Sequence, residues 1–468
     1  MKIPFVGPCY SGRSPYWDGQ ESINLMVETD EAGGKSSMAL VGTPGLVAWL
    51  ALPEVAEVRG ALPCGDGNLY VVCGSMLYRV TPAKVATHVG TLATSSGIVS
   101  MAQNGDQLMI ADNPNGYLLT FNTGSFSKIA NPNFPGASTV AFVDGYFVVS
   151  KPDSEQFFLS GLYDGSVWDG LAWASAQGRP DNLVCLAVSH RETWLLGQSS
   201  TEVWYNAGIA APEFPFDRIS GAFSETGCSA RMSAAVMDNT IFWLTDKGQV
   251  VRASGYAPQI VSTRQMEFLF SQYETWADAF AFSYVQSGHT FYVLTFPSAG
   301  RTWVYDAATG LWHRRRSYGQ GRWRANCYAK FAGLHLVGDA SNGKLYQLSE
   351  TAYSEDGDIL EAIRVTAPIS GEGERLFMSS LQVDFETGVG TVSGQGQDPQ
   401  AMLEWSDDGG RTWSNIYTAS MGKLGQYNAR TIWRRLGSFR NRQFRLSVTD
   451  PVRRIILGAF ADVKKGSN

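Results

Sequence analysis

A unit of about forty residues recurs between Glu57 and Glu350, and it restricts the possible folds more than any other feature. The copy at residues 98–130 has four short apolar runs separated by tight turns, with Asn104-Gly105 at the first turn and Asn115-Gly116 at the second. Asn-Gly pairs favour two-residue hairpins because both residues tolerate positive φ angles. Four short strands cannot bury both faces of their own sheet, so a repeat of this length predicts sheets packed radially, as in a β-propeller.

Matching turns from Asp66-Gly67 to Asn342-Gly343 give about seven blades, with six or eight left open. The last unit lacks a clear fourth strand after Lys344–Leu348, whereas an unassigned apolar stretch, Met38–Val41 with Leu46–Leu50, precedes the first unit. We expect that stretch to supply the missing outer strand and close the ring. Closing a loop of about 300 residues costs on the order of 5 kcal/mol. Burying three or four large apolar side chains, at roughly 1.5–3 kcal/mol each, offsets this cost.

The domain organisation follows from where the repeat starts and stops. Residues 1–36 are polar and rich in turns, which predicts an extended arm able to pack along the propeller or on a neighbour. Residues 37–350 form the predicted propeller, and Arg264–Trp276 within them is the one stretch that favours a short helix. In residues 351–468 the period is lost, and alternating runs separated by Gly-rich turns predict a β-sandwich.

The composition fits a strand-and-turn protein, with 50 Gly, 12% aromatic and only 17% charged residues. No run reaches the roughly 18 apolar residues of a membrane span, and the first residues lack the apolar segment of a secretory signal. None of the six cysteines lies in a CxxC pair, so we expect reduced, structural thiols. We therefore expect a product that stays in the cytoplasm where it is made, or leaves by lysis or inside an assembly.

The sharpest short motif is Ser406-Asp407-Asp408-Gly409-Gly410-Arg411-Thr412-Trp413, which matches the Asp-box of sialidase-type propellers. In this motif the Ser and Asp side chains accept hydrogen bonds from turn amides, glycine permits positive φ, and Trp packs beneath. The motif folds a hairpin and performs no chemistry. We therefore predict a structural role for Ser406, Asp408, Gly410 and Trp413.

The sequence gives little support to an enzyme. Carboxylates are plentiful, but no spacing selects the facing pair that glycoside hydrolysis needs. The five histidines form no metal-ligand pattern, and there is no GxSxG, no P-loop and no GxGxxG after a strand. We predict no catalytic residues, no cofactor and no metal.

Positive charge gathers toward the C-terminal end. Residues 401–468 carry 12 Lys and Arg against 5 Asp and Glu, so they hold +7 and residues 1–400 hold −13. Arginine is favoured where a carboxylate or phosphate must be held by two parallel hydrogen bonds. An interface to an acidic partner and contact with DNA phosphates therefore stay open as alternatives, beside a merely solvated basic face. The candidate residues are Arg314, Arg315, Arg316, Arg434, Arg435, Arg440, Arg442 and Arg445.

Long loops on a rigid ring are where binding surfaces are usually placed. Three connections exceed the usual length: 164–180, 205–227 and the segment around 319–323. The second contains Phe214-Pro215-Phe216, which is too apolar for a freely solvated loop. We predict that this triplet contacts another subunit.

The order of segments resembles the packaged-DNA stabilisation proteins of short-tailed bacteriophages, also described as tail hub or head-completion proteins. The resemblance rests on residues 22–25 (SINL), 40–46 (LVGTPGL), 197–204 (GQSSTEVW) and 433–440 (WRRLGSFR). It covers nearly the whole chain, but the Asp-box has no counterpart that we can match.

This resemblance implies a structural virion protein that joins below the portal-adaptor ring after DNA packaging. Family members form a ring with six-fold symmetry, narrow the DNA exit channel, and carry tailspikes or fibres and a plug or needle. The implied location is the tail of the virion, with assembly in the host cytoplasm. A second hypothesis is a carbohydrate-binding or glycoside-hydrolysing propeller that acts in receptor recognition.

Overall fold

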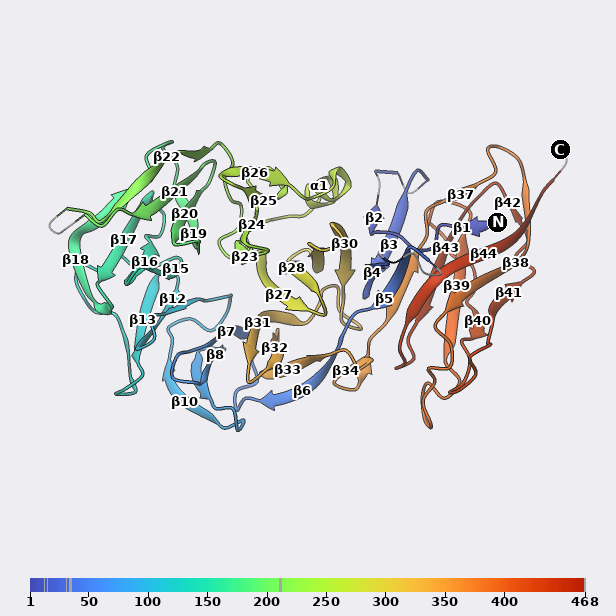
Figure 1. Ribbon diagram of the computed structural model, residues 1–468, viewed down its shortest axis with the longest axis horizontal. Coiled ribbons are helices and arrows are strands. Elements are labelled where there is room, and N and C mark those ends of the chain that lie inside the picture. The colour runs from blue at the N-terminus through green and yellow to red at the C-terminus, as the bar shows by residue number, and fades with distance from the viewer. Residues whose placement is uncertain (12, 15, 31, 33–35, 210–212, 467–468) are drawn as a thin grey trace.

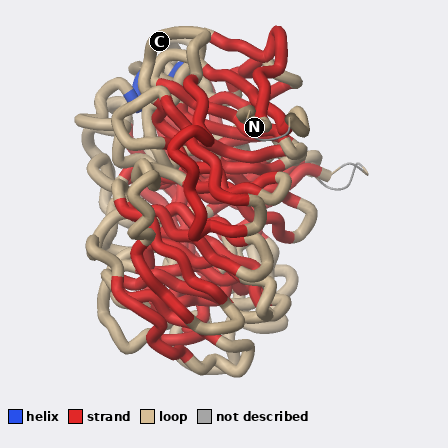
Figure 2. Tube along the Cα trace, turned by 90° about the vertical axis from the view of Figure 1, so that its left-hand side faces the viewer, coloured by secondary structure: helices blue, strands red, loops and turns tan. Residues whose placement is uncertain are grey.

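The chain folds into a β-propeller with a β-sandwich beside it, as seen in a computed structural model that describes residues 1–11, 13–14, 16–30, 32, 36–209 and 213–466. Figure 1 shows the blades arranged around a centre, with the sandwich against one side of the ring. Figure 2, turned by 90°, shows that strands run through the whole molecule. The all-β prediction of a propeller followed by a sandwich is confirmed.

The blade with the clearest repeat shows why the sequence folds this way. It consists of β11 (Ser100–Gln103), β12 (Gln107–Asp112), β13 (Asn115–Thr120) and β14 (Ser125–Lys128), paired antiparallel in chain order. The two central strands are buried almost throughout, whereas β14 is largely exposed at the rim. Neighbouring blades therefore cover both faces of the central strands, which is how short strands obtain a core.

Five further blades have the same antiparallel order of four consecutive strands. The blade before β11–β14 contains β7 (Val58–Pro63), β8 (Leu69–Cys73), β9 (Met76–Val80) and β10 (Ala86–Thr91). The next two contain β15 (Val140–Val143), β16 (Tyr146–Ser150), β17 (Gln156–Gly161) and β18 (Asp164–Ser175), and then β19 (Leu183–Ser189), β20 (Glu192–Gly197), β21 (Thr201–Asn206) and β22 (Phe216–Ser224). The last two contain β23 (Ala235–Met237), β24 (Thr240–Leu244), β25 (Val250–Ser254) and β26 (Ala257–Ile260), and then β27 (Phe280–Gln286), β28 (His289–Phe296), β29 (Arg301–Asp306) and β30 (Leu311–Arg315).

Six blades are thus built from four consecutive strands of the described chain, whereas the predicted count of about seven included the last, incomplete repeat. The last repeat supplies only β31 (Ala325–Phe331), β32 (Leu334–Asp339) and β33 (Lys344–Ser349). Its outer strand is β6 (Gly45–Ala51), which pairs antiparallel with β33 from Leu348↔Leu46 to Lys344↔Ala51. This composite sheet closes the ring, because the innermost strands β31 and β7 also contact each other. The predicted closure by an N-terminal strand is therefore confirmed.

The first half of the stretch predicted to close the ring has a different partner. β5 (Met38–Gly42) pairs with β4 (Leu25–Thr29) and with β44 (Ile455–Lys465) of the sandwich. The expectation that Met38–Val41 belongs to the propeller is therefore wrong. Leu40 points into the sandwich core, where it is fully buried.

The sandwich has two sheets, and both include strands from the first 42 residues. One sheet has the order β4-β5-β44-β38-β41, with β1 (Lys2–Ile3) beside β44 and β42 (Ser438–Phe439) beside β38. The other runs β36-β43-β39-β40 and continues through β3 (Gly19–Ile23) into β30 of the propeller. The remaining bounds are β36 (Ala362–Val365), β37 (Ile369–Ser370), β38 (Leu376–Phe385), β39 (Gln400–Ser406), β40 (Tyr417–Ser420), β41 (Thr431–Arg434) and β43 (Asn441–Val448), with short β2 (Tyr10–Ser11), β34 (Ser354–Glu355) and β35 (Asp358–Ile359).

The segment predicted as an extended arm is thus paired within the same chain. β3 is antiparallel to β36 and parallel to β30, so a single sheet passes from a blade into the sandwich. Ile3 and Phe5 are buried in the sandwich core. The first residues therefore join the two domains.

The described residues contain one helix, α1 (Arg264–Phe270), which links β26 to β27. Thr263 caps it by accepting a hydrogen bond from the Met266 amide at 3.3 Å. The predicted helix over 264–276 is right in place but too long, because the chain turns after Ser271. No helix of the described chain is long and apolar enough to span a membrane.

Candidate functional site

The Asp-box forms a compact turn after β39. Ser406 Oγ donates to Asp408 Oδ1 at 2.7 Å and accepts from the Gly410 amide at 2.8 Å. Asp408 also accepts from the amides of Arg411 and Thr412, both at 2.9 Å. The hydrogen bond from the Thr412 hydroxyl, at 2.6 Å, is the main cause that lowers the pKa of the Asp408 carboxyl below its usual range. The carboxylate is used entirely in holding the turn.

Trp413 of this turn packs at the junction between propeller and sandwich. It lies against Ile23, Ile363 and Val365, which belong to the strands that join the two domains. The Arg445 guanidinium lies 4.3 Å from the Trp413 ring centroid. The Asp-box therefore fixes a side chain of the domain junction and presents no reactive group.

Arg314 and Arg315 lie inside the protein, because they are the last two residues of β30, the outer strand of its blade, and β3 covers that strand. Arg314 Nη1 donates to Glu21 Oε1 at 2.9 Å. Arg315 is fully buried, lies 3.7 Å from the Trp323 ring centroid, and donates from Nη2 to the Pro44 carbonyl at 2.7 Å. The prediction that these two side chains face DNA or another subunit is therefore wrong.

Arg316 is half-buried and donates from Nη2 to Glu361 Oε2 at 2.6 Å. Asn24 binds the same segment, accepting from the Arg316 amide at 3.0 Å and donating to the Arg316 carbonyl at 2.8 Å. Arg314, Arg315 and Arg316 thus bind the N-terminal strands and the start of the sandwich to the ring. They form a structural joint.

The C-terminal arginines divide into two groups. Arg442 and Arg445 each form two-pronged ion pairs, Arg442 with Asp407 at 2.6 and 2.7 Å and Arg445 with Glu404 at 2.7 Å for both bonds. Arg442 is also buried, so it does not face solvent. The prediction of an outward-facing role is wrong for Arg442, and the Arg445 guanidinium is already engaged.

Arg434, Arg435 and Arg440 are exposed on the sandwich, and they keep the predicted role as candidates for contact with DNA or a partner. Arg434 ends β41, and Arg435 follows it in the left-handed backbone region with φ 61°. Arg440 donates one hydrogen bond, to the Gly373 carbonyl at 2.8 Å. We name these three residues the sandwich arginine group.

The apolar triplet predicted to contact a subunit is largely folded against its own blade. Phe216 is buried, and Phe214 packs edge-on against Phe157 with centroids 5.5 Å apart. Phe214 also contacts Trp204. The prediction is therefore wrong for Phe216, whereas Phe214 and Pro215 are half-buried.

A better exposed apolar surface lies beside that triplet, in and next to the long rim strand β18. Leu171 is 77% exposed and shares a hollow of about 220 Å³ with Phe214 and Pro215. The exposed apolar residues of this β18 surface are Leu162, Tyr163, Val167, Leu171 and Trp173. Sequence reasoning noted the length of the 164–180 segment but read it as a loop. The β-branched and aromatic residues Val167, Trp168 and Trp173 were the signal that could have identified a strand.

Two histidines in blade strands are buried with opposite effects on their pKa. Burial lowers the pKa of His313 to about 3, with the charge of Arg315 adding to the effect. Burial would also lower the pKa of His289, but hydrogen bonds to Asp306 at 2.8 Å and Glu28 at 3.0 Å raise it instead. Neither arrangement gathers a catalytic pair. No group of three or more potential metal ligands is found in the described parts of the chain.

These features define a class of protein: a closed propeller fused through a shared sheet to a β-sandwich, with exposed basic and apolar surfaces. Comparison with protein families identifies it further. A family model described as the β-propeller of bacteriophage P22 Gp10 matches residues 1–353, and a model described as the β-sandwich of the same protein matches residues 361–464. The chain belongs to the bacteriophage P22 Gp10 family and is a structural protein of the phage particle.

A search of curated proteins finds no match. Among solved structures, the chain is similar to the WD40 propeller domain of Doa1, with 12% identity, a TM-score of 0.42, and coverage of 66% of this chain and 98% of that one. It is also similar to YCF48 bound to D1 peptide, with 13% identity, a TM-score of 0.41 and coverage of 66% and 98%. The chain is similar as well to PorZ of Porphyromonas gingivalis, with 12% identity and a TM-score of 0.39, and this match covers 80% of this chain and 46% of the PorZ chain.

Proposed function

We propose that this protein is a tail hub or head-completion factor, a non-enzymatic part of the virion tail that assembles in the host cytoplasm. In this proposal it joins the portal-adaptor ring as a homohexamer, retains packaged DNA, and anchors tailspikes or fibres and a plug or needle. The observation that carries the proposal is the match of both domains, in order, to the two P22 Gp10 family models.

The physical design supports a mounting role. One sheet continues from the blade β27–β30 through β3 into the sandwich, and Arg316 pairs with Glu361 across the same junction. A junction made of backbone ladders and buried side chains resists bending more than a linker does. Surfaces on the two domains therefore keep a fixed relation to each other, as the parts of a symmetric ring require.

The β18 surface and the sandwich arginine group are the surfaces we assign to partners. Exposed apolar side chains rimmed by polar residues are typical of protein contacts. The exposed arginines suit a carboxylate on a partner or the phosphates of DNA passing nearby. We assign the β18 surface to a protein neighbour and leave both ligands open for the arginines.

The proposal is tested by producing phage particles without this protein and measuring the packaged DNA that nuclease cannot reach. We expect heads that fill and then lose their DNA, and rings of six copies in electron micrographs of particles that contain the protein. Heads that keep their DNA without it would remove the retention role. A monomer that never joins the portal-adaptor ring would remove the hub role altogether.

Substitutions then test the sandwich arginine group and the β18 surface one at a time. The R434E/R435E variant should weaken DNA retention or attachment to the partner, whereas R79E/K128E, at exposed positions of the propeller, should not. Leu171→Asp should weaken ring formation, with Val55→Asp, which is 79% exposed, as its control. Equal particle yields for the test and control variants would contradict these two assignments while leaving the family role to the deletion experiment.

A further inference from the structure

A pocket of about 280 Å³ lies where several innermost strands of the propeller begin. Residues at the start of β7, β11, β23, β27 and β31, or up to four positions before it, line the pocket together with Pro297 after β28. Its size is at the lower end of small-molecule sites, so it suits a group as large as one amino-acid residue. Nothing in the assembly role uses this pocket.

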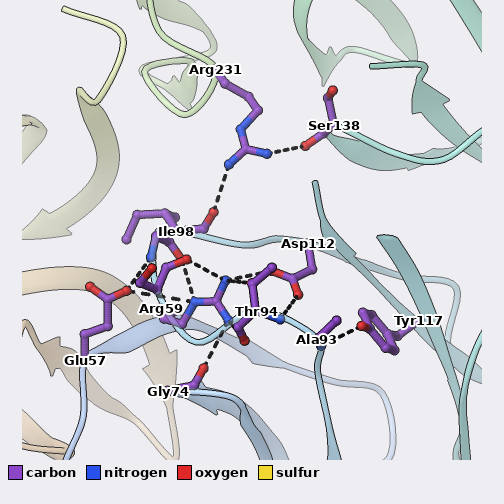
Figure 3. A network of polar contacts seen from close by, with 12 residues as sticks. Glu57, Arg59, Gly74, Ala93, Thr94, Ile98, Asp112, Tyr117, Ser138 and Arg231 are labelled. Atoms are coloured by element: carbon purple, nitrogen blue, oxygen red, sulfur yellow. Dashed lines mark hydrogen bonds and ion pairs between the residues drawn. The ribbon is translucent and has the colours of Figure 1, made fainter. Parts of the chain in front are cut away.

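Arg231, four residues before β23, lines this pocket. Its Nη1 donates to the Ser138 carbonyl at 3.3 Å and its Nη2 to the Ile98 carbonyl at 3.5 Å (Figure 3). These are long bonds to neutral acceptors, and within the described chain Arg231 forms no ion pair with a carboxylate. Burial lowers its pKa, which is the effect of removing a guanidinium from water.

Arg322, three residues before β31, is the second arginine of the pocket. Its Nη1 donates to Asn326 Oδ1 at 2.9 Å, and its guanidinium lies 5.8 Å from the Phe280 ring centroid. It too has no ion pair among the residues that the structure describes, and burial lowers its pKa. Asn326 is only 3% exposed, and its Oδ1 is occupied by Arg322 while its amide nitrogen is available as a donor.

The neighbouring Arg59 is a buried arginine whose charge is paired with a carboxylate and whose N–H groups have hydrogen-bond acceptors. It is buried, forms an ion pair with Asp112 at 2.7 Å, and donates to the carbonyls of Gly74, Thr94 and Ser96 (Figure 3). Buried arginines are normally paired in this way. Arg231 and Arg322 lack a carboxylate partner, as the buried Arg315, Arg364 and Arg454 of the described chain also do, but Arg231 and Arg322 line one pocket together, where a single anion can pair with both.

Two carboxylates also face the pocket and restrict the ligand. Glu57 accepts from the Gly97 amide and lies 3.9 Å from Arg59 Nε, so it is already compensated. Asp278 accepts from the Ser298 amide at 2.7 Å through Oδ2, but its buried Oδ1 has no partner. A doubly charged phosphate would be repelled by these two acids. A single carboxylate with an N–H donor beside it would satisfy both the arginines and Asp278.

We propose that this axial pocket binds a carboxylate that carries a neighbouring N–H group, with Arg231 and Arg322 holding the carboxylate and Asp278 Oδ1 accepting from the N–H. The carboxylate has two sources with the same chemistry: a free acylated amino acid, or an Asp or Glu side chain of an inserted peptide segment. This proposal does not rest on the tail role, and its failure would leave that role untouched.

The test is calorimetric titration of the full chain with N-acetyl-L-glutamate methylamide, which has one carboxylate and peptide N–H groups. We expect saturable binding at one site per chain. N-acetyl-L-glutamine methylamide, which has the same shape without the charge, should bind at least about tenfold more weakly. Propionate, a carboxylate without an N–H, should also bind more weakly.

Variants locate the site. R231Q and R322Q should each weaken binding about tenfold or more, and R79Q, at an exposed position, should bind as the unaltered chain does. Arg231→Lys keeps the charge but loses the planar fork, so it should bind with intermediate affinity and serves if R231Q does not fold. The thermal midpoint of each variant is measured in the same buffer to confirm folding.

Several results would overturn the proposal: no saturable binding of the glutamate derivative, unchanged binding in both R322Q and Arg231→Lys, or tighter binding of inorganic phosphate at the same site. An eight-residue peptide with one central Glu distinguishes the sources. Tighter binding of the peptide than of the single-residue probe supports an inserted segment, and equal or weaker binding supports a free acid.

Discussion

Arg315 lies flat against Trp323, with its guanidinium carbon 3.7 Å from the ring centroid, while its Nη2 reaches the Pro44 carbonyl at 2.7 Å. Trp323 in turn donates from Nε1 to buried Glu355 at 3.1 Å. A blade and the segment that leads into the closing strand therefore meet on one arginine. Burial lowers the pKa of Arg315 and raises that of Glu355, and the opposite charge of each group partly offsets this effect on the other.

Arg315→Ala should lower the free energy of unfolding by about 3 kcal/mol, because it opens a cavity, leaves the Pro44 carbonyl without its donor, and removes the positive charge that favours the ionised form of buried Glu355. Arg315→Met should recover part of this loss by filling the space. Urea unfolding measures both. Arg79→Ala, at an exposed position, should stay within about 0.5 kcal/mol of the unaltered protein. A similarly small change for Arg315→Ala would contradict the role of this stack.

The contribution of the closing strand β6 to stability can be tested by substituting two adjacent residues, one buried and one exposed. Leu46 is 1% exposed in a core cluster, whereas Val47 next to it is 44% exposed. Leu46→Ala should cost about 2–5 kcal/mol and Val47→Ala well under about 1 kcal/mol. Thermal or urea unfolding checks this, and equal costs would show that the closing strand is not held as described.

The pH dependence of stability should include a contribution from His289. Its folded-state pKa is raised above the ordinary value of 6.5 by Asp306 and Glu28, against the opposing effect of burial. The stabilisation it provides is therefore complete below pH 6.5 and is lost as the pH rises through the higher folded-state pKa. The stability difference between the unaltered protein and His289→Asn should shrink between about pH 6 and about pH 8.5.

The matched control is His88→Asn at an exposed position of β10, which should change the free energy of unfolding by less than about 0.5 kcal/mol. Proton NMR titration gives the second readout: the His289 signal should titrate above 6.5, and that of His313 far below it, near 3. A His289 titration at or below 6.5 would contradict the pairing with both acids.

The six cysteines should be unreactive until the protein unfolds. All are free and buried, and burial raises the pKa of Cys9 and Cys73 to about 11 and of Cys64 and Cys327 to about 12. The reactive thiolate of these four residues is therefore scarce at neutral pH, and burial keeps the reagent from Cys185 and Cys228, whose sulfurs lie 4.0 Å apart. A maleimide reagent should modify fewer than about one thiol in the native protein and all of them in denaturant. Rapid native labelling would show that a blade opens readily.

The repeat predicted the architecture because turn chemistry is local. Asn104-Gly105 and similar pairs specify a hairpin without information from the rest of the chain. The strands within residues 2–42 include two whose partners lie far away in the sequence: β1 pairs with β44 and β3 pairs with β36, about 340 or more positions away. No local pattern encodes such pairings, so the segment was predicted as an arm.

The arginines were misjudged for a related reason. A cluster such as Arg314-Arg315-Arg316 has the same composition whether it is solvated or covered by another segment. Glu21, Pro44 and Glu361, which accept its hydrogen bonds, lie in distant parts of the sequence. Only the Asp-box turn, in which Ser406 and Asp408 bind the amides of Gly410, Arg411 and Thr412, could be described in geometric detail beforehand.

The ladder between β1 and β44 sets an order of events during synthesis. Residues 2 and 3 emerge from the ribosome first, yet their register partners are Phe460 and Ala459. Blades such as β11–β14 can form as they are translated, since their strands are consecutive. The opening residues must instead wait, unpaired, until almost the entire polypeptide has been made. A nascent chain stalled before residue 455 would therefore carry blades that β6 and β33 can already close, beside an incomplete sandwich in which β1 lacks its partner strand and is open to capture by a chaperone.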